Sequence, residues 1–119
     1  MALFKRRHLA AIREGRKTQT RRVHKLTWQL GGVYAVRTSY FGKPEGYIRI
    51  IRKFRQRLGD ITAEDVRKEG FSSLEEFKQA WMEIHGSWDP DLVVTVYEFR
   101  IATKKVLQAF KYEKSVKVK

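Results

Sequence analysis

Hydrophobic positions near the start of the chain recur with the period of a helix. These positions are Phe4, His8, Leu9 and Ile12. Their spacing predicts an amphipathic helix over residues 3–14, with the neighbouring cations on its solvent side. Gly15 ends the pattern, and because glycine adopts positive φ without strain, the chain is expected to turn sharply there.

A second helical pattern occurs in the centre of the chain. Its apolar positions are Leu74, Phe77, Trp81 and Ile84. Ser73 stands just before this pattern and Glu76 follows Ser73 by three residues, which is the arrangement of a capping box at a helix start. The sequence therefore predicts a helix over residues 74–85 that buries Trp81, and a shorter helix over residues 62–70.

Strand-like alternation appears in three further segments. Residues 33–37 and 47–54 are rich in β-branched and aromatic side chains, and residues 42–46 between them supply glycine and proline for a turn. Residues 92–101 predict a longer strand with apolar side chains on both faces, so both faces are expected to be partly covered. Together these elements predict an α+β fold with a small, mostly antiparallel β-barrel and about three helices.

The net charge of +13 is distributed unevenly. Residues 1–57 contain 16 Lys or Arg and 2 acids (+14), residues 58–98 contain 3 and 10 (−7), and residues 99–119 contain 7 and 1 (+6). We therefore expect a basic face built from the N-terminal half and the C-terminal end, and an acidic face built from the central helices. Such a field attracts polyanions to one side of the molecule.

Length and composition narrow the class of protein. The 119 residues suit one domain, and we assign residues 1–103 to it and residues 104–119 to a basic C-terminal extension, either a last strand or a mobile arm. Cysteine is absent and the three histidines have no metal-binding spacing, so we predict neither a metal site nor a cofactor. No segment resembles a membrane span or a signal peptide, which predicts a cytoplasmic protein. The lack of Asn and Cys and the abundance of Lys, Arg and Glu suit a thermophile.

The most distinctive segment is GRKTQTRR at residues 15–22. It places four cations and two hydroxyls directly behind a glycine, which predicts an anion-binding site. In an extended chain, Lys17 would share one face with Gln19 while Thr20 lies on the other face. A turn within the segment would bring Lys17 and Thr20 to the same side.

This segment and three later blocks carry a family resemblance. The later blocks are ITAED with KEGF (61–71), WMEIHG (81–86) and VVTVYEF (93–99). In this order and spacing, they resemble the ASCH (activating signal cointegrator homology) domain over roughly residues 3–101. The resemblance implies a barrel similar to that of the PUA domain. One departure is Gly31-Gly32, where the family has a Gly-Asp pair.

The function we predict first is the binding of RNA, or of a nucleotide-like ligand, in a cationic cleft. The predicted binding residues are Arg16, Lys17, Thr18, Thr20, Arg21, Arg22, Trp28, Tyr40 and Phe41. In this prediction the cations contact phosphates and exposed aromatic side chains, including Tyr34, stack on bases. A ribonuclease that uses His24 is a less favoured alternative.

The main alternative is an enzyme, and it comes from the resemblance. Some small bacterial ASCH proteins are amidohydrolases acting on N4-acetylcytidine with a lysine, a threonine and a glutamate, which fall here on Lys17, Thr20 and Glu69. A lysine among cations has its neutral form favoured, and a neutral lysine can activate a threonine hydroxyl. Simpler roles stay open: Lys17 as a phosphate clamp or the ion-pair partner of Glu69, Thr20 as a backbone-bonding side chain, and Glu69 as a counter-charge to the arginines.

Overall fold

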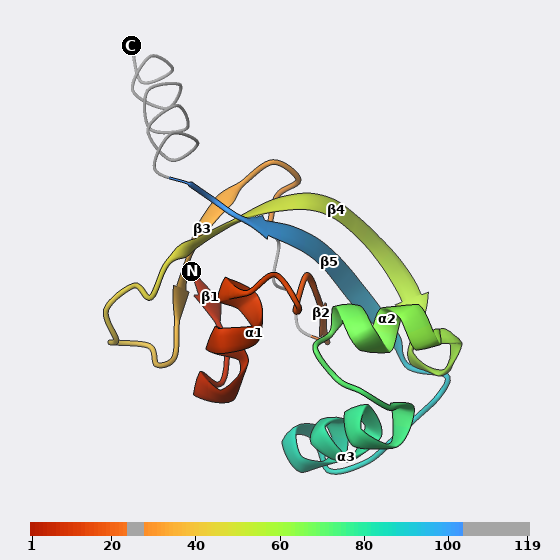
Figure 1. The fold of residues 1–119 in the computed structure, drawn as a ribbon. Helices are drawn as coiled ribbons and strands as arrows, with labels where there is room; N and C mark the ends of the chain where they lie inside the picture. The colour runs from red at the N-terminus through yellow and green to blue at the C-terminus, as the bar shows by residue number, and fades with distance from the viewer. Residues whose placement is uncertain (24–27, 104–119) are drawn as a thin grey trace.

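The computed structural model describes residues 1–23 and 28–103 and shows an α+β fold (Figure 1). In chain order the elements are β1 (Ala2–Leu3), η1 (Arg6–His8), α1 (Leu9–Arg13), β2 (Gln19–Arg22), β3 (Val33–Arg37), β4 (Tyr47–Arg57), η2 (Leu58–Asp60), α2 (Ala63–Lys68), α3 (Leu74–His85) and β5 (Val93–Ile101). The predicted C-terminal extension and His24 lie outside the described residues. No helix in the described part of the chain is long and apolar enough to cross a membrane.

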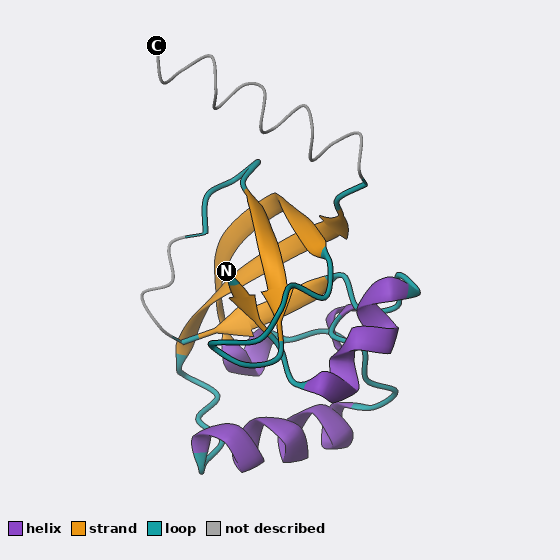
Figure 2. Cartoon of the chain, turned by 90° about the vertical axis from the view of Figure 1, so that its left-hand side faces the viewer, coloured by secondary structure: helices purple, strands orange, loops and turns teal. Residues whose placement is uncertain are grey.

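The sheet is mostly antiparallel, as predicted. Its five strands follow the order β1-β3-β4-β5-β2, and only the β1–β3 pair is parallel. The sheet curves strongly (Figure 2), but β1 and β2 remain its edges, so the structure shows an open sheet and does not show the closed barrel that we predicted. One side chain spans the two edges, because Arg22 Nη2 donates a hydrogen bond to the Leu3 carbonyl oxygen at 2.7 Å.

The N-terminal segment differs from the prediction of one helix over residues 3–14. Ala2 and Leu3 pair with Val36 and Arg37 as β1, and helical structure is confined to Arg6–Arg13. The strand forms because it satisfies backbone groups at the edge of β3 while burying Ala2 completely. The predicted turn at Gly15 is confirmed, with φ at 77°.

The long β4–β5 pair is shared between two hydrophobic cores. On one face of β5, Tyr97 and Phe99 pack with residues of β1, α1, β3 and β4. On the other face, Val94 and Val96 pack with the residues of α2 and α3. The prediction that both faces of this strand are covered is therefore confirmed. Trp81, 5% exposed, lies in the second core as predicted.

The two longer helices begin at side-chain caps. The predicted bounds of α3 are confirmed, and Ser73 Oγ accepts a hydrogen bond from the Glu76 backbone N–H at 3.1 Å. The Glu76 carboxylate instead accepts from Ser72 Oγ, so the reciprocal half of the predicted capping box is not formed. A complete capping box opens α2, between Thr62 and Asp65, which fixes the position of a carboxylate close to β2.

Candidate ligand-binding cleft

The GRKTQTRR segment is fastened between the ends of two helices. The Lys17 backbone N–H donates to the Ala11 carbonyl in α1 at 3.0 Å, and the Thr18 N–H donates to the Lys68 carbonyl at the end of α2 at 2.8 Å. Gly70 follows α2 and has φ at 94°. A Cβ atom added to Gly70 would lie only 3.3 Å from Lys17 Cβ, so the two segments pack closely here. The Lys17 side chain is thus fixed directly beneath the end of α2.

Lys17 and Glu69 form a buried ion pair. Their exposed fractions are 3% and 4%, and Lys17 Nζ lies 2.9 Å from Glu69 Oε1. The ammonium also donates to the carbonyls of Glu69 (2.8 Å) and Gln19 (3.1 Å), so its three N–H groups are all used. Of the simpler roles left open for Lys17, the ion pair with Glu69 is confirmed. Burial lowers the pKa of Lys17, and Arg22 and Arg21 add to this effect while Glu69 opposes it.

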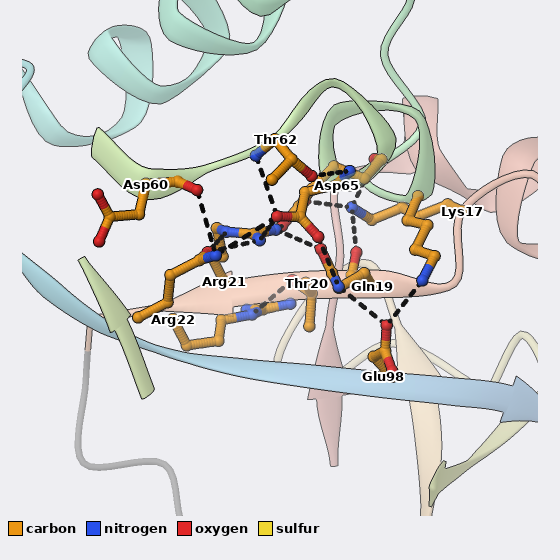
Figure 3. Close-up of polar contacts among 12 residues, drawn as sticks. Lys17, Gln19, Thr20, Arg21, Arg22, Asp60, Thr62, Asp65 and Glu98 are labelled. Atoms are coloured by element: carbon orange, nitrogen blue, oxygen red, sulfur yellow. Dashed lines mark hydrogen bonds and ion pairs between the residues drawn. The ribbon is translucent and has the colours of Figure 1, made fainter. Parts of the chain in front are cut away.

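Arg21 is buried in the same network. Its Nη1 donates to Gln19 Oε1 (2.5 Å) and Glu69 Oε2 (2.9 Å), and its Nε and Nη2 both donate to Gln56 Oε1. Nη2 also lies 3.3 Å from Asp65 Oδ2. These contacts occupy the five donors of the guanidinium. Figure 3 shows Arg21 next to the Asp65 carboxylate. The side chain of Arg21 also lines the cleft described below, but the RNA contact that we predicted for it would have to replace these internal contacts.

The network is close to electrical neutrality. We call Lys17, Arg21, Asp65 and Glu69 the buried network; it contains two cations and two carboxylates joined by ion pairs. Burial acts to raise the pKa of Asp65, but the Thr62 N–H and the charge of Arg21 outweigh it, and the pKa lies below its ordinary value. Carboxylates of the acidic central segment therefore neutralise N-terminal cations, and the charge separation that we expected is incomplete.

Thr20 and Arg22 occupy the opposite face of β2. Arg22 Nε donates to Thr20 Oγ1 at 3.2 Å, and the guanidinium carbon lies 4.8 Å from the ring centre of Phe4 and 5.1 Å from that of Trp28. Among the described residues, Arg22 Nη1 has no hydrogen-bond partner. Burial lowers the pKa of Arg22, although the side chain stays protonated at neutral pH. Unlike Arg21, Arg22 retains donors for a ligand.

These side chains line a cleft of about 330 Å³. Its polar side contains Lys17, Thr20, Arg22 and Glu69, and its apolar wall contains Phe71, Phe77, Trp81 and Ile84. His8 also lines the cleft, and burial together with the charges of Lys17 and Arg7 lowers its pKa to about 4, so it is neutral at pH 7. The volume and the mixture of apolar walls with a few convergent polar groups are typical of small-molecule sites.

The three residues that the family resemblance matched to a catalytic set therefore line one cleft. However, no hydrogen bond between them joins a nucleophile to a general base. Thr20 Oγ1 accepts from Arg22, Lys17 Nζ donates to three oxygens, and no hydrogen bond joins Lys17 to Thr20 within the described structure.

The remaining predicted binding residues fall into three groups. Arg16 is exposed but paired with Glu14 at 2.6 Å. Thr18 is half-buried and its backbone bridges α2 and β5. Trp28 is only 3% exposed and packs on Tyr97, so the prediction that it stacks on bases from an exposed position is wrong.

Two aromatic candidates are exposed as the prediction requires. Tyr40 is 69% and Phe41 97% exposed, and the preceding residues Thr38 and Ser39 line the cleft, so this pair lies beside the rim. Tyr34 is half-buried against Trp28, and its hydroxyl accepts a hydrogen bond from the Gln29 N–H at 2.6 Å. Tyr34 thus has a structural contact, while Tyr40 and Phe41 remain available.

Several residues of the cleft were not identified from the sequence. Phe4 and His8 were assigned only to a helix face, yet both line the cleft, as do residues of α3. Gln19 and Gln56 were given no role, yet both bind Arg21. The alternation of side chains along an extended segment could have indicated the role of Gln19, because it puts Gln19 and Arg21 on one face of β2 and Thr20 on the other.

Nothing in the described ranges, 1–23 and 28–103, groups three or more His, Asp or Glu side chains in a way that could bind a metal ion. The polar groups of the cleft are instead Lys, Arg, Ser, Thr and His side chains with one carboxylate, that of Glu69. This donor set suits an anionic or hydrogen-bonding organic ligand.

Comparison with solved structures identifies the fold. The chain is similar to an ASCH domain from Lactobacillus crispatus JV V101, with a TM-score of 0.67 and 19% identity over 78% of this chain and 69% of that chain. It is also similar to a DUF984 protein from Enterococcus faecalis V583, with a TM-score of 0.63 and 16% identity over 80% of this chain and 69% of that chain. No family model and no curated protein matches the sequence. The fold is thus ASCH-like, as the sequence motifs indicated.

Proposed function

We propose that the protein binds a nucleotide-like ligand, free or as part of RNA, in the cleft between β2, η1 and α3. The observation that carries this proposal is Arg22, whose Nη1 has no partner among the described residues although the guanidinium is stacked near Phe4 and Trp28 at the cleft. A charged donor in such a site recognises a phosphate or a carbonyl oxygen strongly, because it is already oriented and partly dehydrated.

The apolar wall suits the base of the same ligand. Phe71, Phe77 and Trp81 provide aromatic surface on one side of the cleft, while Thr20 and Arg22 provide polar groups on the other side. An aromatic wall opposite a few hydrogen-bonding groups is the usual means of recognising a base that is not paired in a helix.

The exposed aromatic pair extends this site toward RNA. Tyr40 and Phe41 have ring centres 5.8 Å apart beside the cleft rim, and they offer a surface on which a neighbouring base can stack. Lys17, by contrast, has no free donor, so we assign the ligand contact first predicted for Lys17 to Arg22.

The direct test is calorimetric titration of the protein with the four ribonucleoside 5′-monophosphates. We expect at least one to bind and Arg22→Gln to weaken binding by roughly 10- to 100-fold, the usual effect of losing a hydrogen bond between charged groups. The matched control is Arg49→Gln, which removes the same charge from an exposed residue of β4. Equal affinities for the wild-type protein and Arg22→Gln, or no binding of any monophosphate, would reject the proposal.

A second candidate function is hydrolysis of an N-acylated nucleoside such as N4-acetylcytidine. It is favoured by the convergence of Lys17, Thr20 and Glu69 on one cleft and by the lowered pKa of Lys17. Thr20 Oγ1 would attack the acetyl carbonyl as its proton passes to neutral Lys17, the C–N bond would break, and the leaving amine would take a proton. Water would then hydrolyse the acetyl-threonine ester to acetate.

This candidate requires a rearrangement of hydrogen bonds. Lys17 must release a proton and turn from Glu69 toward Thr20, whose hydroxyl accepts from Arg22. Mass spectrometry of products from N4-acetylcytidine tests the hypothesis. Turnover is expected for the wild type and for Thr20→Ser, which keeps the hydroxyl, and is expected to be lost in Thr20→Ala. Activity that survives in Thr20→Ala would exclude Thr20 as the nucleophile.

A further inference from the structure

A row of cations on β4 lies in register with the cleft. Across β2, β5 and β4, Arg22 pairs with Thr95 and Thr95 with Arg55. In the next row, Thr20 pairs with Tyr97 and Tyr97 with Lys53. Directly paired residues of antiparallel strands project from the same face. Arg55 and Lys53 therefore share a face with the two cleft residues Arg22 and Thr20.

These two cations are not neutralised within the protein. Lys53 and Arg55 are exposed, and neither has a carboxylate partner in the described structure. Lys53 Nζ instead lies 5.6 Å from the ring centre of Tyr97. The next cation on this face, Arg57, differs because it is paired with Asp60 at 3.1 Å and Asp91 at 2.6 Å. We call Lys53 and Arg55 the β4 cation row.

We propose that a single strand of RNA whose nucleotide occupies the cleft continues across this face, with its phosphates bound by Arg55 and Lys53. This inference rests on the proposed function of the cleft. Residues two apart on a strand are separated by about 7 Å, and Arg22 and Arg55, two strands apart, by about 10 Å. The phosphates of a flexible, extended single strand can span these distances between the cations. A duplex, with its rigid geometry, is not required.

The β4 strand argues for a polyanionic partner by its composition. It contains five cations and no acid, although neighbouring like charges raise the energy of the folded protein. Two of the five are paired within the protein, Arg52 with Glu98 and Arg57 with Asp60 and Asp91. Glu98 is shared with Gln19 and Lys68, and no carboxylate in the described structure reaches Lys53 or Arg55. A strand with this excess of positive charge is stabilised when an external polyanion covers it.

The test compares two double variants of the whole protein in binding to a single-stranded RNA of about ten nucleotides. Lys53→Gln with Arg55→Gln removes the β4 cation row. Arg49→Gln with Arg100→Gln removes the same charge from the same two-stranded ribbon, but from the opposite face, since Arg49 pairs with Arg100 and alternates with buried Ile48 and Ile50. We measure the slope of log affinity against log salt concentration for each.

Loss of two phosphate contacts on a single strand should reduce that slope by about 1.4 for the Lys53 and Arg55 variant, with little change for the Arg49 and Arg100 variant. Equal reductions would indicate attraction by net charge alone and would overturn the inference, as would greater loss in the Arg49 and Arg100 variant. Tighter binding of heparin or anionic vesicles than of RNA would also overturn it.

Titration with a nucleoside monophosphate separates this inference from the proposed function. The Lys53 and Arg55 variant should bind the monophosphate as the wild type does, because neither residue lines the cleft. If the monophosphate binds while the RNA slope is unchanged by this variant, the cleft proposal stands and the inference fails. If no monophosphate binds, the proposed function fails whatever the RNA result.

Discussion

Arg21 and Arg55 lie on strands that flank the same β5 strand, yet the protein surrounds the two charges in opposite ways. Arg21 belongs to the buried network, where it is 5% exposed and bound to two carboxylates and two glutamines. Arg55 belongs to the β4 cation row, where it is exposed without a carboxylate partner among the described residues. The chemical group is the same, and the surroundings decide whether it serves the fold or a ligand.

The comparison shows how the cations of the basic N-terminal half divide. Those that face α2 are matched by Asp65 and Glu69, because a buried charge without a partner costs several kcal/mol. Those of the β4 cation row are exposed to solvent, where a charge needs no carboxylate partner. Arg22 is intermediate, since it is partly buried but retains donors at the cleft. We therefore expect Arg22 and the β4 cation row to bind ligands, and we expect the buried network to stabilise the fold.

The largest expected effect is the loss of stability in Arg21→Met. This change leaves Glu69 and Asp65 buried or half-buried with fewer partners, and we expect it to lower the free energy of unfolding by about 3–5 kcal/mol. Urea denaturation measures the change. Arg55→Met is the matched control and should stay within about 0.5 kcal/mol of the wild type. Equal effects at the two positions would show that burial does not separate the two regions.

A smaller loss is expected for Lys17→Met. Methionine fills most of the space of the lysine stem, and Glu69 keeps its contact with Arg21, but one carboxylate oxygen and two carbonyls lose a donor. We expect a loss of about 2 kcal/mol in the same denaturation experiment. The control is Lys68→Met, whose more exposed ammonium pairs with Glu98 and Glu64 and should cost about 1 kcal/mol or less. A Lys17 variant as stable as the Lys68 variant would contradict the structural role.

The pH dependence of stability tests the burial of His8 and the effect of the cations around it. His8 has its pKa lowered to about 4, so between pH 6.5 and 4 the unfolded chain binds a proton that the folded protein does not. Stability should therefore fall as the pH decreases through this window, by about 1–2 kcal/mol after allowance for solvent screening at this partly exposed group.

His8→Gln should flatten the profile between pH 6.5 and 4, because it removes the imidazole whose pKa is lowered to about 4. The carboxylate of Asp65 affects stability in a different pH range. The pKa of Asp65 is lowered, so its contribution is present above the ordinary pKa of an aspartate and is lost only on further acidification. A profile in His8→Gln that keeps the wild-type slope would refute the assignment to His8.

The same comparison explains which features the sequence could predict. Helix α3, the β3–β4 pair and β5 were predicted because their apolar positions have a clear period and flanking caps or turns. The convergence of Lys17, Thr20 and Glu69 was anticipated only through the family resemblance, because 49 residues separate Thr20 from Glu69. Periodicity describes one segment at a time and contains no information on which segments meet.

Burial of the polar residues in β2 could not be predicted for a related reason. Gln19, Thr20 and Arg21 are all at most 5% exposed, yet each is polar, so no hydrophobic alternation marks a buried face. The error for Trp28 was the opposite one, a buried residue predicted to be exposed. Its basic neighbours suggested a solvent-exposed position, whereas Phe4, Tyr34 and Tyr97 cover its ring. In both cases tertiary partners distant in sequence decide the environment.

The smallest expected effect concerns the two arginines on the opposite face of the ribbon. Arg49 and Arg100 are directly paired, both exposed and without a carboxylate partner in the described structure, so their charges repel each other. Arg49→Thr replaces a repulsive pair with a residue that favours strands, and we expect a gain in the free energy of unfolding of about 0.2–1 kcal/mol at low salt. The gain should shrink in 1 M salt, where such charges are screened.

The control is Arg55→Thr. Arg55 has Thr95 opposite it rather than an arginine, so the gain in this variant should be smaller and less dependent on salt. If both variants gain equally, the repulsion is a property of the whole basic strand and not of the Arg49–Arg100 pair.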